Sequence, residues 1–410
     1  MITALKGAVL IDGTGKEPLG NSLLLMENGR ILYAGPDEPD RLPGKAEIIS
    51  LEGKTVLPGL IDVHIHMDLH GMANTFEENL VEDKLRAIRT TREMQDTLYS
   101  GITTVRNVGS VNHIDFAVKK AIASGWFDGP RILTCGKIIS MTTAGNEYFA
   151  GMYREADGCD EVRKAAREQI KAGADFLKLM ATGAYMNPGG IPGASQLSRE
   201  EMAVVVEEAR KVGLRVAAHA HGKEGIINAI KAGVHTIEHG TFIDDEVIEL
   251  MIDCGVYLVP TLSAGYLMEK YGPERGVPSF MLEKSRGEDR RFRESLCRAI
   301  EAGVKVAFGT DAGTNYNFHG RNALELVILV EQGYMEPLQA ISSATKVSAE
   351  ALGLAEGLGT LEAGKAADVI VVNGVLDKSL EPLLDKVEMV YTGGRQVRPV
   401  LYKGQEYELI

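Results

Sequence analysis

The chain has 410 residues, of which 45% are hydrophobic and 25% charged, and its formal net charge is -13. These proportions are typical of a globular protein and exclude a disordered or fibrous one, and the length suits one large barrel or two to three ordinary domains. The acidic balance argues against nucleic acid as a partner, because phosphate groups bind to a basic face.

The first part of the chain, residues 1–56, contains short apolar runs separated by turns. Asn28 and Gly29 stand between the runs 22–26 and 31–35, and Asn-Gly between apolar runs is a strong hairpin signal. We therefore expect residues 1–56 to consist of β-strands.

From residue 57 onward, strand-like and helix-like segments alternate, and several helical patterns end in glycine, as expected of a C-terminal cap. Eight strands alternating with helices indicate an α/β fold with a (β/α)8 TIM barrel, which we place at residues 57–356. A doubly wound open sheet is the alternative, but its glycine-rich fingerprint does not follow the first strand. The expected strands are 61–66, 103–107, 131–135, 176–180, 215–219, 235–239, 256–260 and 305–309.

After one helix expected at residues 337–352, the pattern returns to strands at residues 369–372 and 387–391. Both ends of the chain are thus predicted to be β, and chain termini usually lie close together in a domain. We therefore expect residues 1–56 and 357–410 to form one small β-sandwich beside the barrel.

Two histidines, His64 and His66, end the first expected barrel strand. Residues two apart on a strand share a face, so both imidazoles, together with Asp62, point the same way. Imidazole nitrogen is the commonest protein ligand of zinc and related metals. Taken alone, the pair is also compatible with two structural histidines that are only hydrogen-bonded.

Further polar residues lie where other barrel strands end. Lys178 lies near the end of the fourth strand, His219 and His239 close the fifth and sixth, and Asp311 follows the eighth. In a barrel these ends form one rim, which is where active sites lie. We therefore expect these residues and the His64/His66 pair to meet at one cavity.

These motifs resemble those of the amidohydrolase superfamily of metal-dependent hydrolases, in the subgroup with two metal ions and a bridging lysine carbamate. The segments 101–106, 218–222 and 309–313 are similar to the imidazolonepropionase-related dipeptidases. Those relatives cleave Xaa-Pro or Xaa-Arg/Lys dipeptides and related N-acyl amino acids. The resemblance covers essentially the whole chain and also implies the flanking β domain.

The resemblance implies a complete set of metal ligands. Lys178 would bridge two divalent ions as a carbamate, and burial supports this because it favours the free amine that adds CO2. The alternative is a lysine that extends to the rim to meet a carboxylate. Zn2+ is the expected metal on general ligand chemistry. The other implied ligands are His64, His66 and Asp311 for one ion and His219 and His239 for the other.

Asp311 is also the expected catalytic residue, which would take a proton from water and deliver it to the leaving amine. His221 is predicted to act as an oxyanion donor, or else as a strand-exit histidine bonded to the backbone. Asn146, where many relatives carry histidine, and Tyr185 and His319 are candidates for substrate contact.

The expected function is therefore hydrolysis of an amide bond in a small substrate, a dipeptide or an N-acyl amino acid. Arg106-Asn107 stands where relatives often carry Arg-Asp, so the resemblance does not determine which substrate is cleaved. A single-metal deaminase or cyclic amide hydrolase that uses His221 and Glu224 is the alternative, because these residues match an H-x-x-E pattern. A non-catalytic barrel is a further alternative, although none of the ligands is missing.

Partners and location are constrained only in general terms. Four scattered cysteines without a C-x-x-C pair argue against a disulfide framework. The first residues lack the features of a signal peptide, and no apolar stretch reaches the ~18 residues of a membrane span. We expect a cytoplasmic homo-oligomer that binds a small molecule and contacts neither nucleic acid nor membrane.

Overall fold

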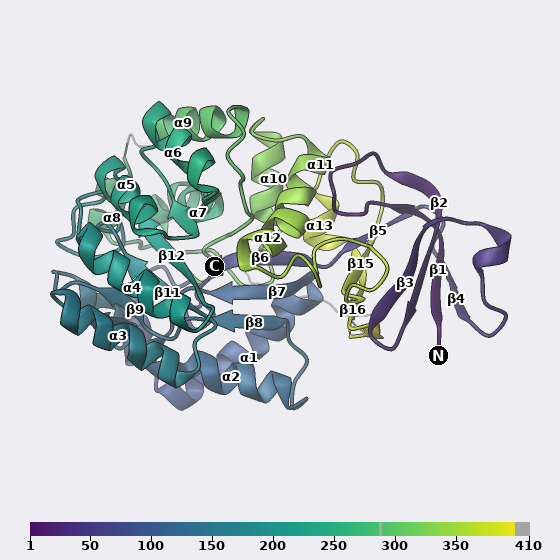
Figure 1. Ribbon diagram of the computed structural model, residues 1–410, viewed down its shortest axis with the longest axis horizontal. Helices are drawn as coiled ribbons and strands as arrows, with labels where there is room; N and C mark the ends of the chain where they lie inside the picture. Colours follow the sequence, from purple (N-terminus) through teal and green to yellow (C-terminus); the bar gives the residue numbers. More distant parts are fainter. Residues whose placement is uncertain (287–288, 398–410) are drawn as a thin grey trace.

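The computed structural model describes residues 1–286 and 289–397, whose named strands form three sheets (Figure 1). An eight-stranded sheet lies at one end of the molecule, and helices surround the parallel strands of the other two sheets. Parallel strands that alternate with covering helices make this an α/β fold of the TIM-barrel type. No helix in residues 1–286 or 289–397 is long and apolar enough to cross a membrane.

Both ends of the chain contribute to the eight-stranded sheet, as the sequence predicted. β5 pairs antiparallel with β15, and Val56 lies opposite Val371 in this register. The Asn28-Gly29 turn joins β2 to β3 with both residues at positive φ. A two-layered sandwich remains a prediction, and residues 398–410 of the expected segment lie outside the described residues. The strands are β1 (Thr3–Leu10), β2 (Leu19–Glu27), β3 (Arg30–Pro36), β4 (Glu47–Ser50), β5 (Lys54–Pro58), β15 (Val369–Asn373), β16 (Val387–Thr392) and β17 (Arg395–Gln396).

The parallel strands fall into a three-stranded sheet, β6-β7-β8, and a six-stranded sheet, β10-β9-β11-β12-β13-β14. Every residue of β6, β7 and β11 is buried, as expected of strands covered on both faces. These strands are β6 (Leu60–Ile65), β7 (Ile102–Asn107), β8 (Arg131–Thr134), β9 (Ile138–Ser140), β10 (Tyr153–Glu155), β11 (Phe176–Met180), β12 (Arg215–Ala220), β13 (Thr236–His239) and β14 (Tyr257–Val259).

The last expected barrel strand, residues 305–309, is reduced to an isolated parallel bridge between Val306 and Leu258. The amide of Val63 donates to the carbonyl of Phe308 at 2.9 Å on the other side of this segment. Residues 305–308 therefore connect β14 to β6 and join the two parallel sheets.

Thirteen α-helices are assigned within the described ranges. Gly173, Gly233 and Gly255 adopt left-handed conformations directly after α3, α5 and α6, which confirms the expected glycine caps. The helices are α1 (Asp83–Tyr99), α2 (Ile114–Ala123), α3 (Cys159–Ala172), α4 (Arg199–Lys211), α5 (Lys223–Ala232), α6 (Asp245–Cys254), α7 (Leu262–Tyr271), α8 (Ser279–Ser285), α9 (Asp289–Glu301), α10 (Leu324–Glu331), α11 (Pro337–Ser342), α12 (Ser348–Leu352) and α13 (Pro382–Asp385).

Residues 337–352 are helical throughout, as predicted, but the helix contains a π-helical turn. A π-helical turn, Ser343–Val347, separates α11 from α12. The carbonyl of Ser343 accepts from the Ser348 hydroxyl at 2.8 Å and from the Phe308 amide at 3.4 Å. These contacts accompany the π-helical turn, and the one from Phe308 connects this helix to the segment that precedes Asp311.

Candidate metal centre and cavity

A cavity of about 450 Å3 lies where the parallel strands end. All six residues predicted as metal ligands line it, although they come from five different segments of the chain. This position agrees with the rule that active sites of TIM-type folds lie at the C-terminal ends of the strands. The six residues are His64, His66, Lys178, His219, His239 and Asp311.

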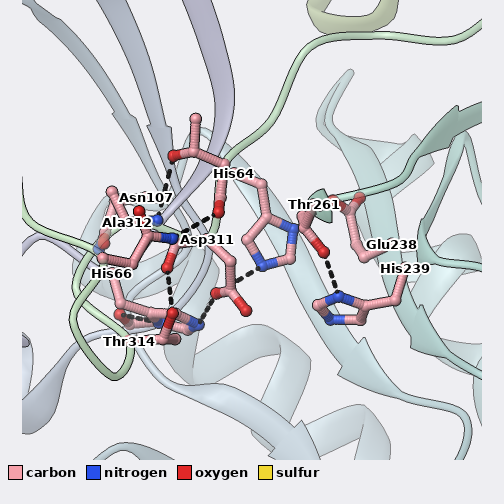
Figure 2. Close-up of polar contacts among 12 residues, drawn as sticks. His64, His66, Asn107, Glu238, His239, Thr261, Asp311, Ala312 and Thr314 are labelled. Carbon is pink, nitrogen blue, oxygen red and sulfur yellow. Dashed lines mark hydrogen bonds and ion pairs between the residues drawn. The ribbon is translucent and has the colours of Figure 1, made fainter. Parts of the chain in front are cut away.

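One group of ligand atoms gathers around the carboxylate of Asp311 (Figure 2). Its Oδ1 lies 3.3 Å from Nε2 of His64 and 3.5 Å from Nε2 of His66. Burial lowers the pKa of His66 to about 4, whereas the pKa of Asp311 falls because the two imidazoles outweigh the effect of burial. Neutral imidazole and ionised carboxylate are the forms that bind a divalent metal.

A second group consists of the buried His219 and His221 and the half-buried His239, and their ligand atoms lie within 4.8 Å of one another. The Nδ1 of His221 lies 2.8 Å from Oγ1 of Thr241, and that of His239 lies 2.7 Å from Oγ1 of Thr261. Burial holds the pKa values of His219 and His239 well below their usual range. These histidines are therefore neutral and have a second nitrogen available.

The nitrogen Nε2 of His219 tests whether this donor set fits a metal. It is buried, and it forms no hydrogen bond with the described part of the chain. Leaving a buried polar atom without a partner costs free energy, so native structures rarely contain one without a reason. A metal ion would supply that partner, and the surrounding imidazoles are suitable ligands for zinc.

Left-handed backbone conformations occur where the strands deliver their ligands. His239 has φ 69°, Thr261 φ 53° and Asp311 φ 60°, and such values are costly for a β-branched residue such as threonine. Along a regular strand, Glu238 and His239 would point to opposite faces. In the structure Glu238 contacts His64, and a ligand atom of His239 lies within 4.8 Å of those of His64 and Asp311. The strained backbone thus accompanies a functional arrangement of side chains.

Lys178 lines the cavity, and only 2% of its surface is exposed. Burial lowers the pKa of its ammonium group to about 8, and Arg106 acts in the same direction while Glu238 opposes it. A substantial fraction of the side chain is therefore a free amine in weakly alkaline solution.

Asp62, which shares the face of His64 on the strand, does not join the ligands. Its carboxylate accepts hydrogen bonds from the Thr310 hydroxyl at 2.6 Å and from the Asn322 side chain at 2.7 Å. It also accepts from the backbone amide of His64 at 3.0 Å. Asp62 therefore connects β6 to the segment that carries Asp311.

Sequence reasoning assigned no role to Glu238 and treated Arg106 only as part of a departure from relatives. Glu238 is completely buried, and its Oε2 lies 2.6 Å from Nδ1 of His64. Arg106 donates to the other carboxylate oxygen at 2.7 Å. The signal was present, because a charged residue inside an otherwise apolar strand needs a buried partner.

The three candidates for substrate contact differ in position. Tyr185 lines the cavity, and its ring centroid lies 4.7 Å from that of His221. Asn146 does not line the cavity. It accepts a hydrogen bond at 3.1 Å from Asn187, and Asn187 does line the cavity. His319 does not line the cavity either, and its Nε2 is hydrogen-bonded to the carbonyl of Leu69.

The alternative proton shuttle, Glu224, is exposed on the first turn of α5 and does not line the cavity. His221, the other residue of that H-x-x-E pattern, does line it. The pair is therefore divided between the cavity and the surface.

The cavity walls are largely apolar, and two arginines, Arg286 and Arg293, also contribute to the lining. The segment that contains α7 and α8 forms one wall, which sequence reasoning did not foresee. Such a cavity suits a small ligand with an apolar group and a few polar anchors. Its apolar and aromatic side chains include Phe149, Met152, Tyr153, Met180, Met186, Tyr266 and Met268.

Comparison with known proteins gives a consistent result. A family model described as "Amidohydrolase family" matches residues 55–405. Ochratoxinase of Aspergillus niger is 32% identical over 447 residues, which cover 98% of this chain and 87% of that protein. A Xaa-Pro dipeptidase solved with methionine in its active site has a TM-score of 0.90 and 35% identity, and covers 97% of this chain and 100% of its own. A prolidase solved with N-methylphosphonate-L-proline has a TM-score of 0.88 and 32% identity, and the match covers 97% of this chain and 100% of that chain.

Proposed function

This chain belongs to the amidohydrolase family and is a hydrolase of carbon–nitrogen bonds, and from that premise we propose that it cleaves a dipeptide or an N-acyl amino acid with two divalent metal ions. The observation that carries the proposal is the convergence of six ligand-type side chains on one cavity. An exposed acidic cluster would not have this donor set, and a structural site would be closed to substrate.

In this proposal His64, His66 and Asp311 hold one ion, and His219 and His239 hold the other. Lys178 would hold both ions once its amine had added CO2 to form a carbamate, and Zn2+ is the expected metal. The metals supply positive charge that acidifies a water molecule and polarises the amide carbonyl. The lowered pKa of Lys178 supports the carbamate, because only the free amine reacts with CO2.

The lysine carbamate predicts a pH dependence. The folded-state pKa of Lys178 is about 8, so the fraction of free amine increases as the pH rises through that value. Reconstitution of metal-free protein with Zn2+ and bicarbonate should therefore be faster at about pH 9 than at about pH 7. The measurement is the rate at which activity returns, and equal rates at both pH values would contradict the carbamate.

The protein's own residues perform the proton transfers. Asp311 is ionised, so its carboxylate accepts the proton that water loses and passes it to the leaving amine. His221 is neutral because burial lowers its pKa to about 3. If the Thr241 hydroxyl donates to Nδ1 of His221, the Nε2 hydrogen is left to donate to the carbonyl oxygen of the substrate.

The walls support an apolar side chain on the substrate, and Arg286 and Arg293 are suited to a terminal carboxylate. The similarity to a Xaa-Pro dipeptidase and to a prolidase supports a dipeptide as the substrate. A dipeptide or an N-acyl amino acid fits a cavity of about 450 Å3. The substrate is thus an amide between an acyl group and the nitrogen of an amino acid.

A substrate panel tests this function. Metal-reconstituted protein is assayed with apolar dipeptides, N-acyl amino acids and lactones, and a sample stripped with EDTA is the control. We expect release of the free amino acid from the amides and loss of turnover after metal removal. Release of ammonia from a cyclic amidine or ring opening of a cyclic amide, with no dipeptide cleavage, would instead favour the single-metal alternative.

We also propose that the chain forms two domains. Residues 57–356 form a closed eight-stranded barrel, and residues 1–56 and 357–410 form a β-sandwich. A bond from the Asp175 amide to the Thr134 carbonyl at 2.8 Å connects β8 to the start of β11 and supports closure. A cytoplasmic homo-oligomer that acts on a small molecule remains our expectation, and light scattering of the purified protein would test the oligomer.

A further inference from the structure

Glu238 carries a charge in the interior of the molecule, where none of its surface is exposed. Its carboxylate accepts hydrogen bonds from the Thr236 hydroxyl, from Arg106 at 2.7 Å and from Nδ1 of His64 at 2.6 Å. The guanidinium of Arg106 and this carboxylate thus form a buried ion pair. Glu238 is therefore an ionised and well-satisfied acceptor.

An ionised carboxylate can only accept hydrogen bonds, so Nδ1 of His64 must carry a hydrogen. When this histidine is neutral, its lone pair is then on Nε2, which lies 3.3 Å from Oδ1 of Asp311. Nε2 is the nitrogen that faces the proposed ligands of the first ion (Figure 2). Glu238 thus selects the tautomer in which His64 can bind metal.

Arg106 holds Glu238 in place from a neighbouring part of the fold. Its guanidinium bonds Glu238, the hydroxyl of Thr236 at 3.1 Å and the carbonyl of Val63 at 2.5 Å. It also lies over the ring of Phe176, 5.2 Å from the ring centroid. These contacts connect β6, β7, β11 and β13, so the Arg106–Glu238 pair is a rigid part of the interior.

We infer that Glu238, held by Arg106, is a positioning residue that fixes the orientation and tautomer of His64 and so sets the affinity of the centre for its first ion. The inference rests on the proposed function, since it requires His64 to be a metal ligand. The same strand then serves both ions, because Glu238 orients a ligand of one ion and His239 binds the other.

Glu238→Gln tests this inference with little change of shape. The amide nitrogen can donate to Nδ1 of His64, which moves the ring hydrogen to Nε2 where it competes with the ion. Loss of such an outer partner typically weakens metal affinity by about 10- to 100-fold, and we expect this for one ion only. Chelator competition measures each affinity, and the visible spectrum of Co2+-loaded protein reports the changed ligand geometry.

Glu93→Gln is the matched control. Glu93 is buried and bonds Nδ1 of His70, so the same substitution changes another buried carboxyl that contacts a histidine, although burial raises the pKa of Glu93. Neither residue lines the cavity. Thermal unfolding of both metal-free variants separates lost stability from lost metal affinity. We expect unchanged metal affinities in Glu93→Gln.

Arg106→Gln supplies an independent readout if Glu238→Gln does not fold. Because Arg106 acts through Glu238, its substitution should weaken the same ion, and the two substitutions together should not be additive. The inference would be overturned if Glu238→Gln bound both ions with wild-type affinity. If only Arg106→Gln folds, wild-type affinity of that variant for both ions would overturn it. A wild-type protein that binds no metal would instead refute the proposed function.

Discussion

Replacing Lys178 with alanine is expected to remove hydrolysis and to lower metal content while the protein remains folded. Metal polarisation is worth several kcal/mol, so the rate should fall by about 10^3-fold or more. The fold should persist, because the substitution removes a buried amine whose charge is costly to bury. Metal analysis, steady-state kinetics and circular dichroism on the same samples measure the three effects.

Two further variants make this result specific. Lys178→Met keeps most of the side-chain volume but has no amine, so it should lose metal as the alanine variant does. Lys119→Ala removes a lysine that pairs with Asp175 away from the cavity, and it should keep full metal and full rate. A Lys178→Ala protein with wild-type metal content and wild-type rate would show that the lysine does not bridge the ions.

The second large effect is expected from Asp311→Asn. General acid–base catalysis contributes about 10^2- to 10^4-fold, and an amide cannot take up the proton that a carboxylate accepts. We therefore expect kcat to fall within that range while KM changes little. Because Asp311 is also a proposed ligand, metal content must be measured in parallel and restored with excess Zn2+ before the kinetics.

Asp115→Asn provides the control for a buried aspartate outside the cavity. Asp115 accepts a hydrogen bond from the Gly136 amide at 3.1 Å and does not line the cavity. This variant should lose stability but retain kcat. If Asp311→Asn raised KM with kcat unchanged, Asp311 would bind substrate rather than transfer the proton.

Much of the fold was predictable because its signals are local. Alternating strand and helix patterns placed β11, β12 and β13 to within a residue or two, and glycine caps marked several helix ends. The six predicted ligands also meet at one cavity, since the end of each parallel strand leads to the same rim. The β-strands at the two chain ends share one sheet, as expected from strand patterns at both ends of the chain, and β5 pairs with β15.

The remaining features depend on contacts that no single segment specifies. The left-handed conformation of His239 is a tertiary effect, and without it Glu238 and His239 would face apart. The π-helical turn begins at Ser343, whose carbonyl accepts a hydrogen bond from Phe308, a residue distant in sequence. The cavity wall formed by α7 and α8 follows β14, and neither a helical period nor a turn signal in this segment indicates which residues face the cavity.

The Arg106–Glu238 pair shows what sequence reasoning can overlook. The positions of Lys178, His219 and His239 on their strands predict metal ligands, whereas the sequence around Glu238 does not indicate Arg106 as its partner. The structure indicates that interior charges deserve the same scrutiny, because the low dielectric interior makes a satisfied ion pair specific in its geometry.

The most direct test of the account is the relation between bound metal and rate. Metal-free protein is titrated with Zn2+ in the presence of bicarbonate, and bound metal per chain and amide hydrolysis are measured on the same samples. The account predicts that the rate reaches its maximum at about two ions per chain and depends on Lys178. The account would be contradicted if the rate reached its maximum at about one ion per chain and neither a second ion nor the Lys178→Ala substitution changed that rate.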